Sequence, residues 1–199
     1  MAIKFGGVES GIKKKGFIKG IFLGLIVVAM HIASFYYMTG TVEWHPLLVL
    51  PASFVFTIII PLAFIIAFIF NIRKSIGGYW SFRQAATAIF IMLFTTYVML
   101  TIGRDILFVK LAEPHMVQKI GAVMIRSREL KDKFDGMTPA QIDKDLVVTK
   151  QNFNIPPNVN PWTVVLSNLP ENIILTFVLA IIFTAIFRRE RLAIRETPE

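Results

Sequence analysis

The sequence predicts an all-α membrane protein with four transmembrane helices and a helical extracytoplasmic segment between helices 3 and 4. Hydrophobic residues make up 55% of the 199 residues, which is more apolar surface than a soluble domain of this size buries. The chain contains four apolar stretches, each near the length of about 20 residues that crosses roughly 30 Å of hydrocarbon. Basic residues concentrate in three segments that such a topology places on one side of the membrane.

The four predicted membrane helices belong to a single integral membrane domain, 1–199. They cover residues 17–38, 47–70, 85–103 and 169–187. The second has no charged residue and contains Pro51 and Pro61, which membrane helices tolerate because neighbouring groups satisfy the freed carbonyls. A cleavable signal peptide is the alternative for the first, but its apolar run continues past His31 without a suitable small-residue cleavage site. We expect Asn168 to cap the N-terminus of the fourth.

The distribution of charge indicates how the chain is oriented. The two termini and the connection between the second and third helices contain 12 basic and four acidic residues, whereas the remainder contains nine of each. Because Lys and Arg concentrate in cytoplasmic segments, we expect both the N-terminus and the C-terminus in the cytoplasm. Topology then explains the net charge of +8, so the expected partner is the lipid bilayer and no nucleic acid is implied.

Residues 109–168 form the expected extracytoplasmic segment, which contains two helices and an extended linker. The first helix follows Pro114 and ends at Gly136, because glycine suits a left-handed C-cap. The second begins after Thr138, where Gln141 completes a capping box. Both carry apolar stripes, which would let the pair lie on the membrane surface or on each other.

Three glycines in the first membrane helix form the best-defined pattern in the chain. Gly16, Gly20 and Gly24 are four residues apart, so they lie on one helix face. Without side chains, two helix backbones approach closely, which favours association in lipid. This helix-packing interface serves either the packing of the protein itself or a homodimer or partner membrane protein.

Four polar residues are intramembrane candidates for function, since ionisable groups are costly in lipid. His31 either relays protons or, as lone membrane histidines more often do, forms a hydrogen bond to a threonine of a neighbouring helix. Arg104, Asp105 and Glu171 lie at the outer ends of the third and fourth helices. They form either a salt bridge between these helices or a substrate or proton site.

We identify no catalytic, cofactor-binding or metal-binding residues in the sequence. Cysteine is absent, which excludes thiolate catalysis and cysteine-based metal sites. No Gly-x-Ser-x-Gly or Ser-x-x-Lys motif, phosphate-binding glycine loop or closely spaced histidine pair is present. We therefore expect that the protein is not an enzyme and needs no cofactor.

Two motifs give the chain a family resemblance. One is the stretch 72–85, IRKSIGGYWSFRQA, a basic turn and a glycine pair that lead into the third helix. The other is the start of a polar helix at 137–142, MTPAQI. With these motifs the sequence resembles the domain-of-unknown-function 4199 family, small inner-membrane proteins of Bacteroidota, over nearly the whole chain. The resemblance implies a multi-pass protein of the bacterial inner (plasma) membrane and supplies no catalytic residue or activity.

The function that the sequence favours is a non-enzymatic accessory or scaffold subunit that binds partner membrane proteins. The alternative is a small oligomeric transporter or channel component. A third hypothesis, an enzyme acting on a lipid-linked substrate, would use Arg104 and Glu171 at the outer interface.

Overall fold

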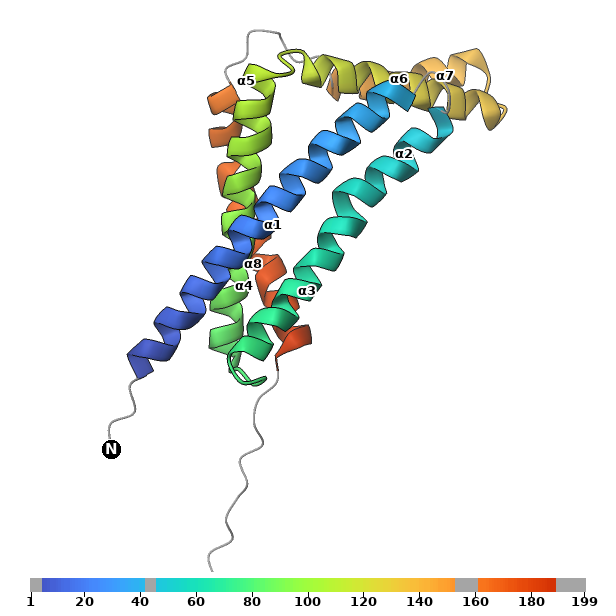
Figure 1. Cartoon of the computed structure of the whole chain (residues 1–199). Helices are drawn as coiled ribbons and strands as arrows, with labels where there is room; N and C mark the ends of the chain where they lie inside the picture. Colours follow the sequence, from blue (N-terminus) through green and yellow to red (C-terminus); the bar gives the residue numbers. More distant parts are fainter. Residues whose placement is uncertain (1–4, 42–45, 153–160, 189–199) are drawn as a thin grey trace, which may run out of the picture. The chain divides into compact units, whose positions relative to one another are not determined.

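The structure, a computed structural model, describes residues 5–41, 46–152 and 161–188, which form helices and short connections without a strand (Figure 1). In chain order the elements are α1 (Phe5–Thr41), α2 (Pro46–Phe54), η1 (Val55–Ile59), α3 (Ile60–Ser75), α4 (Phe82–Leu100), η2 (Thr101–Phe108), α5 (Val109–Leu111), α6 (Met116–Phe134), α7 (Pro139–Asn152) and α8 (Pro161–Phe187). The elements η1 and η2 are π-helical and continuous with their neighbours. The all-α class is confirmed.

Within the described residues, four continuous helices are long and apolar enough to cross a membrane. They comprise Ser10–Thr41, Leu47–Ser75, Phe82–Leu111 and Val165–Phe187. Each predicted span lies within one of them, so the prediction of four membrane helices is confirmed. The helices extend past the predicted spans because a helix continues through polar residues at the membrane surface. They fit a multi-pass protein that contacts a lipid bilayer.

Packing divides the chain into two units, and the division falls once within each of the four long helices. The basic unit comprises residues 1–24, 63–98 and 169–199, and the hairpin unit comprises residues 25–62 and 99–168. The basic unit takes its name from the lysines and arginines at the ends of its helices, and the hairpin unit from the helix pair α6 and α7.

A buried tryptophan organises the helix ends of the basic unit. Gly77 and Gly78 turn the chain between α3 and α4 with φ angles of 96° and 83°, a left-handed conformation that favours glycine. Trp80 follows them and is buried, with its Nε1 donating to the carbonyl oxygen of Phe187 at 3.2 Å. Arg73 Nη1 donates to the same oxygen at 3.4 Å, so both side chains satisfy a terminal carbonyl of α8.

Two buried apolar clusters fix α6 to the membrane helices of the hairpin unit. They consist of Phe35, Phe108 and Met116, and of Met38, Val49 and Val123. The rings of Phe35 and Phe108 meet edge to face with centroids 5.7 Å apart, a favourable aromatic geometry. The apolar stripe of α6 therefore lies against α1, α2 and η2.

The helix pair between the third and fourth membrane helices was predicted closely. Helix α6 ends two residues before Gly136, whose φ is 77°. Helix α7 begins at Pro139, and the backbone N–H of Thr138 donates to Gln141 Oε1 at 2.9 Å, which is one of the two bonds of a capping box. The Thr138 hydroxyl donates to the same oxygen at 2.9 Å. The two helices lie side by side, as Figure 1 shows. The predicted linker falls largely on residues 153–160, outside the described residues.

The expected cap of the last membrane helix was wrong. Helix α8 begins at Pro161 and continues through Asn168 and Pro170. Proline fits the first turn of a helix because its missing N–H has no intrahelical acceptor there. At Pro170 the lost hydrogen bond falls inside the helix, where membrane helices tolerate proline.

The two π-helical elements interrupt the membrane helices at different kinds of sequence. Element η1 comes just before Pro61, which has no N–H to donate to a carbonyl of the preceding turn. The N–H of Ile60 bonds to the carbonyl of Val55, five residues earlier. Element η2 contains no proline but does contain Gly103, Arg104 and Asp105. Because π-helical turns are frequent at functional sites, these three residues of η2 are candidates for a functional role.

Candidate functional site

A histidine, an arginine and an aspartate lie together within the membrane helices of the hairpin unit. His31 comes from α1, and Arg104 and Asp105 come from η2. The close contact of Val28, three residues before His31, with Gly103, directly before Arg104, brings these two stretches of helix together, so we treat the three residues as one group. We call it the polar cluster. Three of the four predicted intramembrane residues are therefore brought together.

Gly103 is what allows η2 to approach α1 at this point. An added Cβ at Gly103 would lie 2.9 Å from Cγ2 and 3.1 Å from Cγ1 of Val28, closer than side-chain atoms normally pack. Val28 precedes His31 by three residues and shares its face of α1. The close contact therefore holds the imidazole beside η2.

His31 has a defined tautomer when its ring is neutral. Its Nδ1 lies 2.9 Å from the carbonyl oxygen of Val27, which accepts the N–H of that nitrogen. The neutral ring then has a lone pair on Nε2, the atom that binds a proton or accepts a hydrogen bond. This bond stays within α1, whereas we expected a threonine of another helix. Thr57, one of the threonines considered as a partner for His31, donates its hydroxyl to the carbonyl oxygen of Ser53, four residues earlier, as helical threonines commonly do.

Arg104 and Asp105 neutralise each other. The Nε of Arg104 donates to Asp105 Oδ1 at 2.6 Å, and the side chains are 31% and 32% exposed. Among the residues that the structure describes, these two form a salt bridge only with each other. A neighbouring opposite charge lowers the cost of placing either ion in a membrane helix.

The fourth predicted residue, Glu171, belongs to the other unit. It lies on α8 and is exposed. A salt bridge from Arg104 or Asp105 to Glu171 therefore stays a prediction.

The glycine face is covered within the chain. An added Cβ at Gly16 would lie 2.7 Å from the carbonyl oxygen of Ala88, and one at Gly20 would lie 2.6 Å from Cβ of Thr95. The hydroxyl of Thr96 also donates to the carbonyl of Gly20 at 3.2 Å. Gly24 is buried as well. At Gly16 and Gly20 the face serves the packing of α1 on α4.

Two residues with notable surroundings, Gly103 and Asp132, were not predicted from the sequence. Gly103 had a signal, a glycine directly before a charged pair in an apolar helix. Asp132 on α6 had none, because its burial depends on tertiary packing. Its side chain is 1% exposed, and neither oxygen accepts a hydrogen bond among the described residues. The nearest cation is Arg128, with Nε 3.7 Å from Asp132 Oδ1.

The geometry limits the chemistry of the polar cluster. The imidazole and the carboxylate exchange protons or accept hydrogen bonds, and the guanidinium binds anions. No group of three or more histidine, aspartate or glutamate side chains in the described ranges is arranged to hold a metal ion.

Fold and site together define a multi-pass helical membrane protein with a helical hairpin packed on three of its membrane helices. The chain belongs to the family described as protein of unknown function (DUF4199), which it matches over residues 19–189. The family resemblance is therefore confirmed. No curated protein and no solved structure matches the chain.

Proposed function

We propose that the protein is a non-enzymatic accessory subunit that binds a partner membrane protein through the turn of the α6–α7 hairpin. The observation that carries the proposal is an apolar surface at that turn, outside the four membrane helices. Phe134 is 79% exposed and Met137 is 40% exposed. Exposed apolar residues on the membrane helices contact lipid, but these two lie in a polar segment where an apolar group favours a protein partner.

The hairpin holds this surface in a fixed conformation. Arg128 on α6 donates to Asp145 on α7 at 2.6 Å, and this contact holds the pKa of the Asp145 carboxyl below its usual range. Ile142 and Leu146 of α7 are buried. A preorganised surface loses little conformational entropy on binding, which favours its use in recognition.

The turn itself presents an aromatic side chain. Gly136 adopts its left-handed conformation between Phe134 and Met137, and the capping box of α7 follows at once. Exposed aromatic side chains held by rigid elements are typical anchors of protein interfaces.

Purification of the tagged protein from native membranes in mild detergent tests the proposal. We expect a defined particle heavier than the chain alone, with one co-purifying membrane protein in fixed ratio. Phe134→Ser should lower its recovery about tenfold, a loss of roughly 1.4 kcal/mol that suits one interface anchor. The matched control is Leu111→Ser, because Leu111 is 81% exposed but lies at the end of a membrane helix. Recovery of the same partner with Phe134→Ser, or of no partner with the native chain, contradicts the proposal.

The proposed location is a bacterial inner membrane with both termini in the cytoplasm and the hairpin on the other side. The charge distribution along the sequence supports it. Because the chain has no cysteine, single cysteines test it directly. A membrane-impermeant maleimide should label Lys144→Cys on α7 in intact cells and Lys14→Cys on α1 only after lysis. The reverse pattern would invert the topology.

A second function, passage of protons through an oligomer, is favoured by the polar cluster alone. Nε2 of His31 and the carboxylate of Asp105 are proton acceptors within membrane helices. In proteoliposomes with an internal pH-sensitive dye, Asp105→Asn and His31→Ala should each lower proton flux about tenfold or more. Lys144→Gln on the hairpin surface is the control. Flux that is absent in the native protein, or equal in all variants, removes this candidate.

A further inference from the structure

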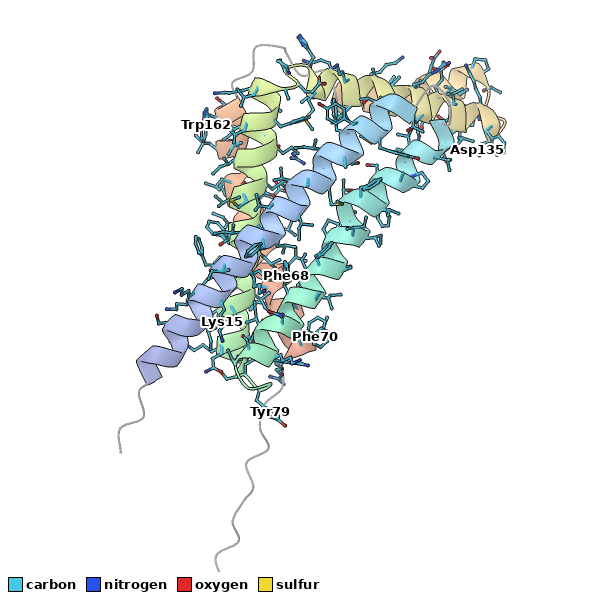
Figure 2. The ribbon with its side chains drawn as sticks, viewed as in Figure 1. Lys15, Phe68, Phe70, Tyr79, Asp135 and Trp162 are labelled. Carbon is cyan, nitrogen blue, oxygen red and sulfur yellow. The ribbon has the colours of Figure 1, made fainter. Side chains whose placement is uncertain are left out.

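Lysines and arginines of two helices gather at one end of the basic unit. Lys15 and Lys19 are four residues apart on α1 and share a face, while Arg73 and Lys74 lie in the last turn of α3. The Nζ of Lys15 donates to the carbonyl oxygen of Ser75 at 2.8 Å, which brings α1 beside the end of α3. Figure 2 labels Lys15 on α1 and Phe70 on α3.

Among the side chains that the structure describes, these cations have no carboxylate beside them. Glu171 on α8 is the only acidic residue among the side chains of the basic unit that the structure describes. Glu171 lies about 24 Å from Phe187 along α8, at about 1.5 Å per residue. Phe187 is the residue that Arg73 reaches. A carbonyl oxygen satisfies an N–H but cancels no charge, so a net positive charge remains and attracts an anion.

The same cations lie directly on apolar surface. The Nζ of Lys19 is 5.2 Å from the ring centroid of Phe68, and the guanidinium of Arg73 is 4.8 Å from that of Phe70. The Phe70 side chain is 44% exposed. Positive charge next to an exposed ring on a membrane helix matches an anion that has a hydrocarbon chain attached.

We infer that this surface, formed by Lys15, Lys19, Arg73, Lys74 and Phe70, binds an anionic phospholipid. Lys15 and Lys74 flank the end of α3 and contact the phosphate, since an ammonium has more N–H donors than the bond to Ser75 uses. An acyl chain lies along the exposed ring of Phe70. Basic surfaces between membrane helices recognise lipid headgroups in this way. The occupant is a lipid and not free phosphate, because the apolar part of the surface has no use in binding phosphate.

Thermal unfolding of the purified protein in mild detergent tests the inference. We expect phosphatidylglycerol to raise the melting temperature by about 5 °C relative to phosphatidylcholine, and added salt to reduce this difference. Lys15→Gln/Lys74→Gln should reduce the difference to less than half, while the new amide on α1 can still donate to the carbonyl of Ser75. The matched control is Lys144→Gln/Lys150→Gln on α7, which removes the same charge and should keep the full difference.

Three results would overturn the inference. The first is that phosphatidylcholine raises the melting temperature as much as phosphatidylglycerol does. The second is that phosphatidylglycerol raises the melting temperature of the Lys15→Gln/Lys74→Gln protein as much as that of the native protein. The third is that soluble glycerol phosphate, which has the headgroup chemistry without a chain, gives the same rise. If the double variant is unstable, Lys74→Gln alone decides, because Lys74 is exposed and its loss leaves the bond from Lys15 to Ser75 intact. That single variant should still lower the phosphatidylglycerol effect measurably below that of the native protein.

Discussion

The lysines and arginines of the basic unit and of the hairpin unit have different kinds of hydrogen-bond partner. In the hairpin unit, lysines and arginines pair with carboxylates, as Arg128 does with Asp145 and Lys131 with Asp135, each at 2.6 Å. In the basic unit, Lys15 and Arg73 donate to backbone carbonyls. A carboxylate cancels the charge of its partner, whereas a carbonyl leaves it in place. The hairpin unit, with nine basic and eight acidic residues, is thus close to neutral, whereas the basic unit, with 12 and five, keeps a large positive charge.

This difference suggests a division of roles. A charge-balanced surface with an exposed aromatic turn suits recognition of another protein, because binding need not displace a tightly held counterion. A surface with excess positive charge next to apolar rings suits a lipid. Each role depends on one unit keeping its own packing.

The largest effect is expected from Gly20→Leu in the basic unit. Its Cβ would lie 2.6 Å from Cβ of Thr95 and 2.7 Å from the carbonyl oxygen of Met92, so α1 and α4 must separate. Overpacking of this kind costs about 3 kcal/mol. Gly11→Leu is the control, because nothing lies within 4 Å of an added Cβ there. Thermal unfolding monitored by size-exclusion chromatography should show early loss of the Gly20→Leu protein only. Equal stability of both variants would mean that the helices are not packed through this glycine.

A smaller effect is expected from Arg128→Ala in the hairpin unit. Asp132 is 1% exposed, and the guanidinium of Arg128 is its nearest cation at 3.7 Å. Without that charge a buried carboxylate has no compensation, and the link to Asp145 is lost as well. Amide hydrogen exchange in α7 should become about tenfold faster, because the hairpin opens more often. Arg126→Ala is the control, since Arg126 is exposed and pairs only loosely with Glu129 at 3.8 Å. Similar exchange in the two variants would show that Asp132 needs no cation.

The two units should also respond differently to acid. Arg128 holds the pKa of Asp145 below its usual range, and Lys133 does the same for Glu129. A carboxyl group with a lowered folded-state pKa contributes stability above its unfolded pKa, about 4, and loses it as the pH falls through the folded value. Exchange in α7, corrected for intrinsic rates, should therefore rise between about pH 5 and about pH 2 relative to α4. Asp145→Asn should remove most of this dependence. Parallel acid sensitivity of α4 would contradict the contrast.

The features that were predicted from the sequence are those set by residues close together along the chain. The turn at Gly136 and the cap at Thr138 depend on residues within one helical turn, and both were predicted. The four membrane helices follow from composition over about 20 residues. The glycine face was also predicted, but its contact with Ala88 and Thr95 was left open because periodicity does not show which helix it meets.

What the sequence did not predict depends on contacts between distant residues. In the sequence Asp132 resembles an exposed charge on a polar helix, and its burial follows only when α7 and α2 pack around α6. The bond from His31 to Val27 replaced an expected bond across helices. The polar cluster requires Gly103 to meet Val28 from another helix, and no local rule gives that contact.

The smallest effect is expected from Lys131→Ala, which removes the pair with Asp135. The side chains are 47% and 40% exposed, so water already solvates both charges. Exposed pairs four residues apart on a helix contribute roughly 0.3–0.5 kcal/mol, and alanine recovers part of that through its helix propensity. The melting temperature should change by less than about 2 °C. A larger fall in the melting temperature would mean that surface ion pairs hold the hairpin together. The two units would then differ in how their ion pairs contribute to stability. A negligible change supports a contrast in charge balance, in which the carboxylates of the hairpin unit do for its cations what lipid phosphates do for those of the basic unit.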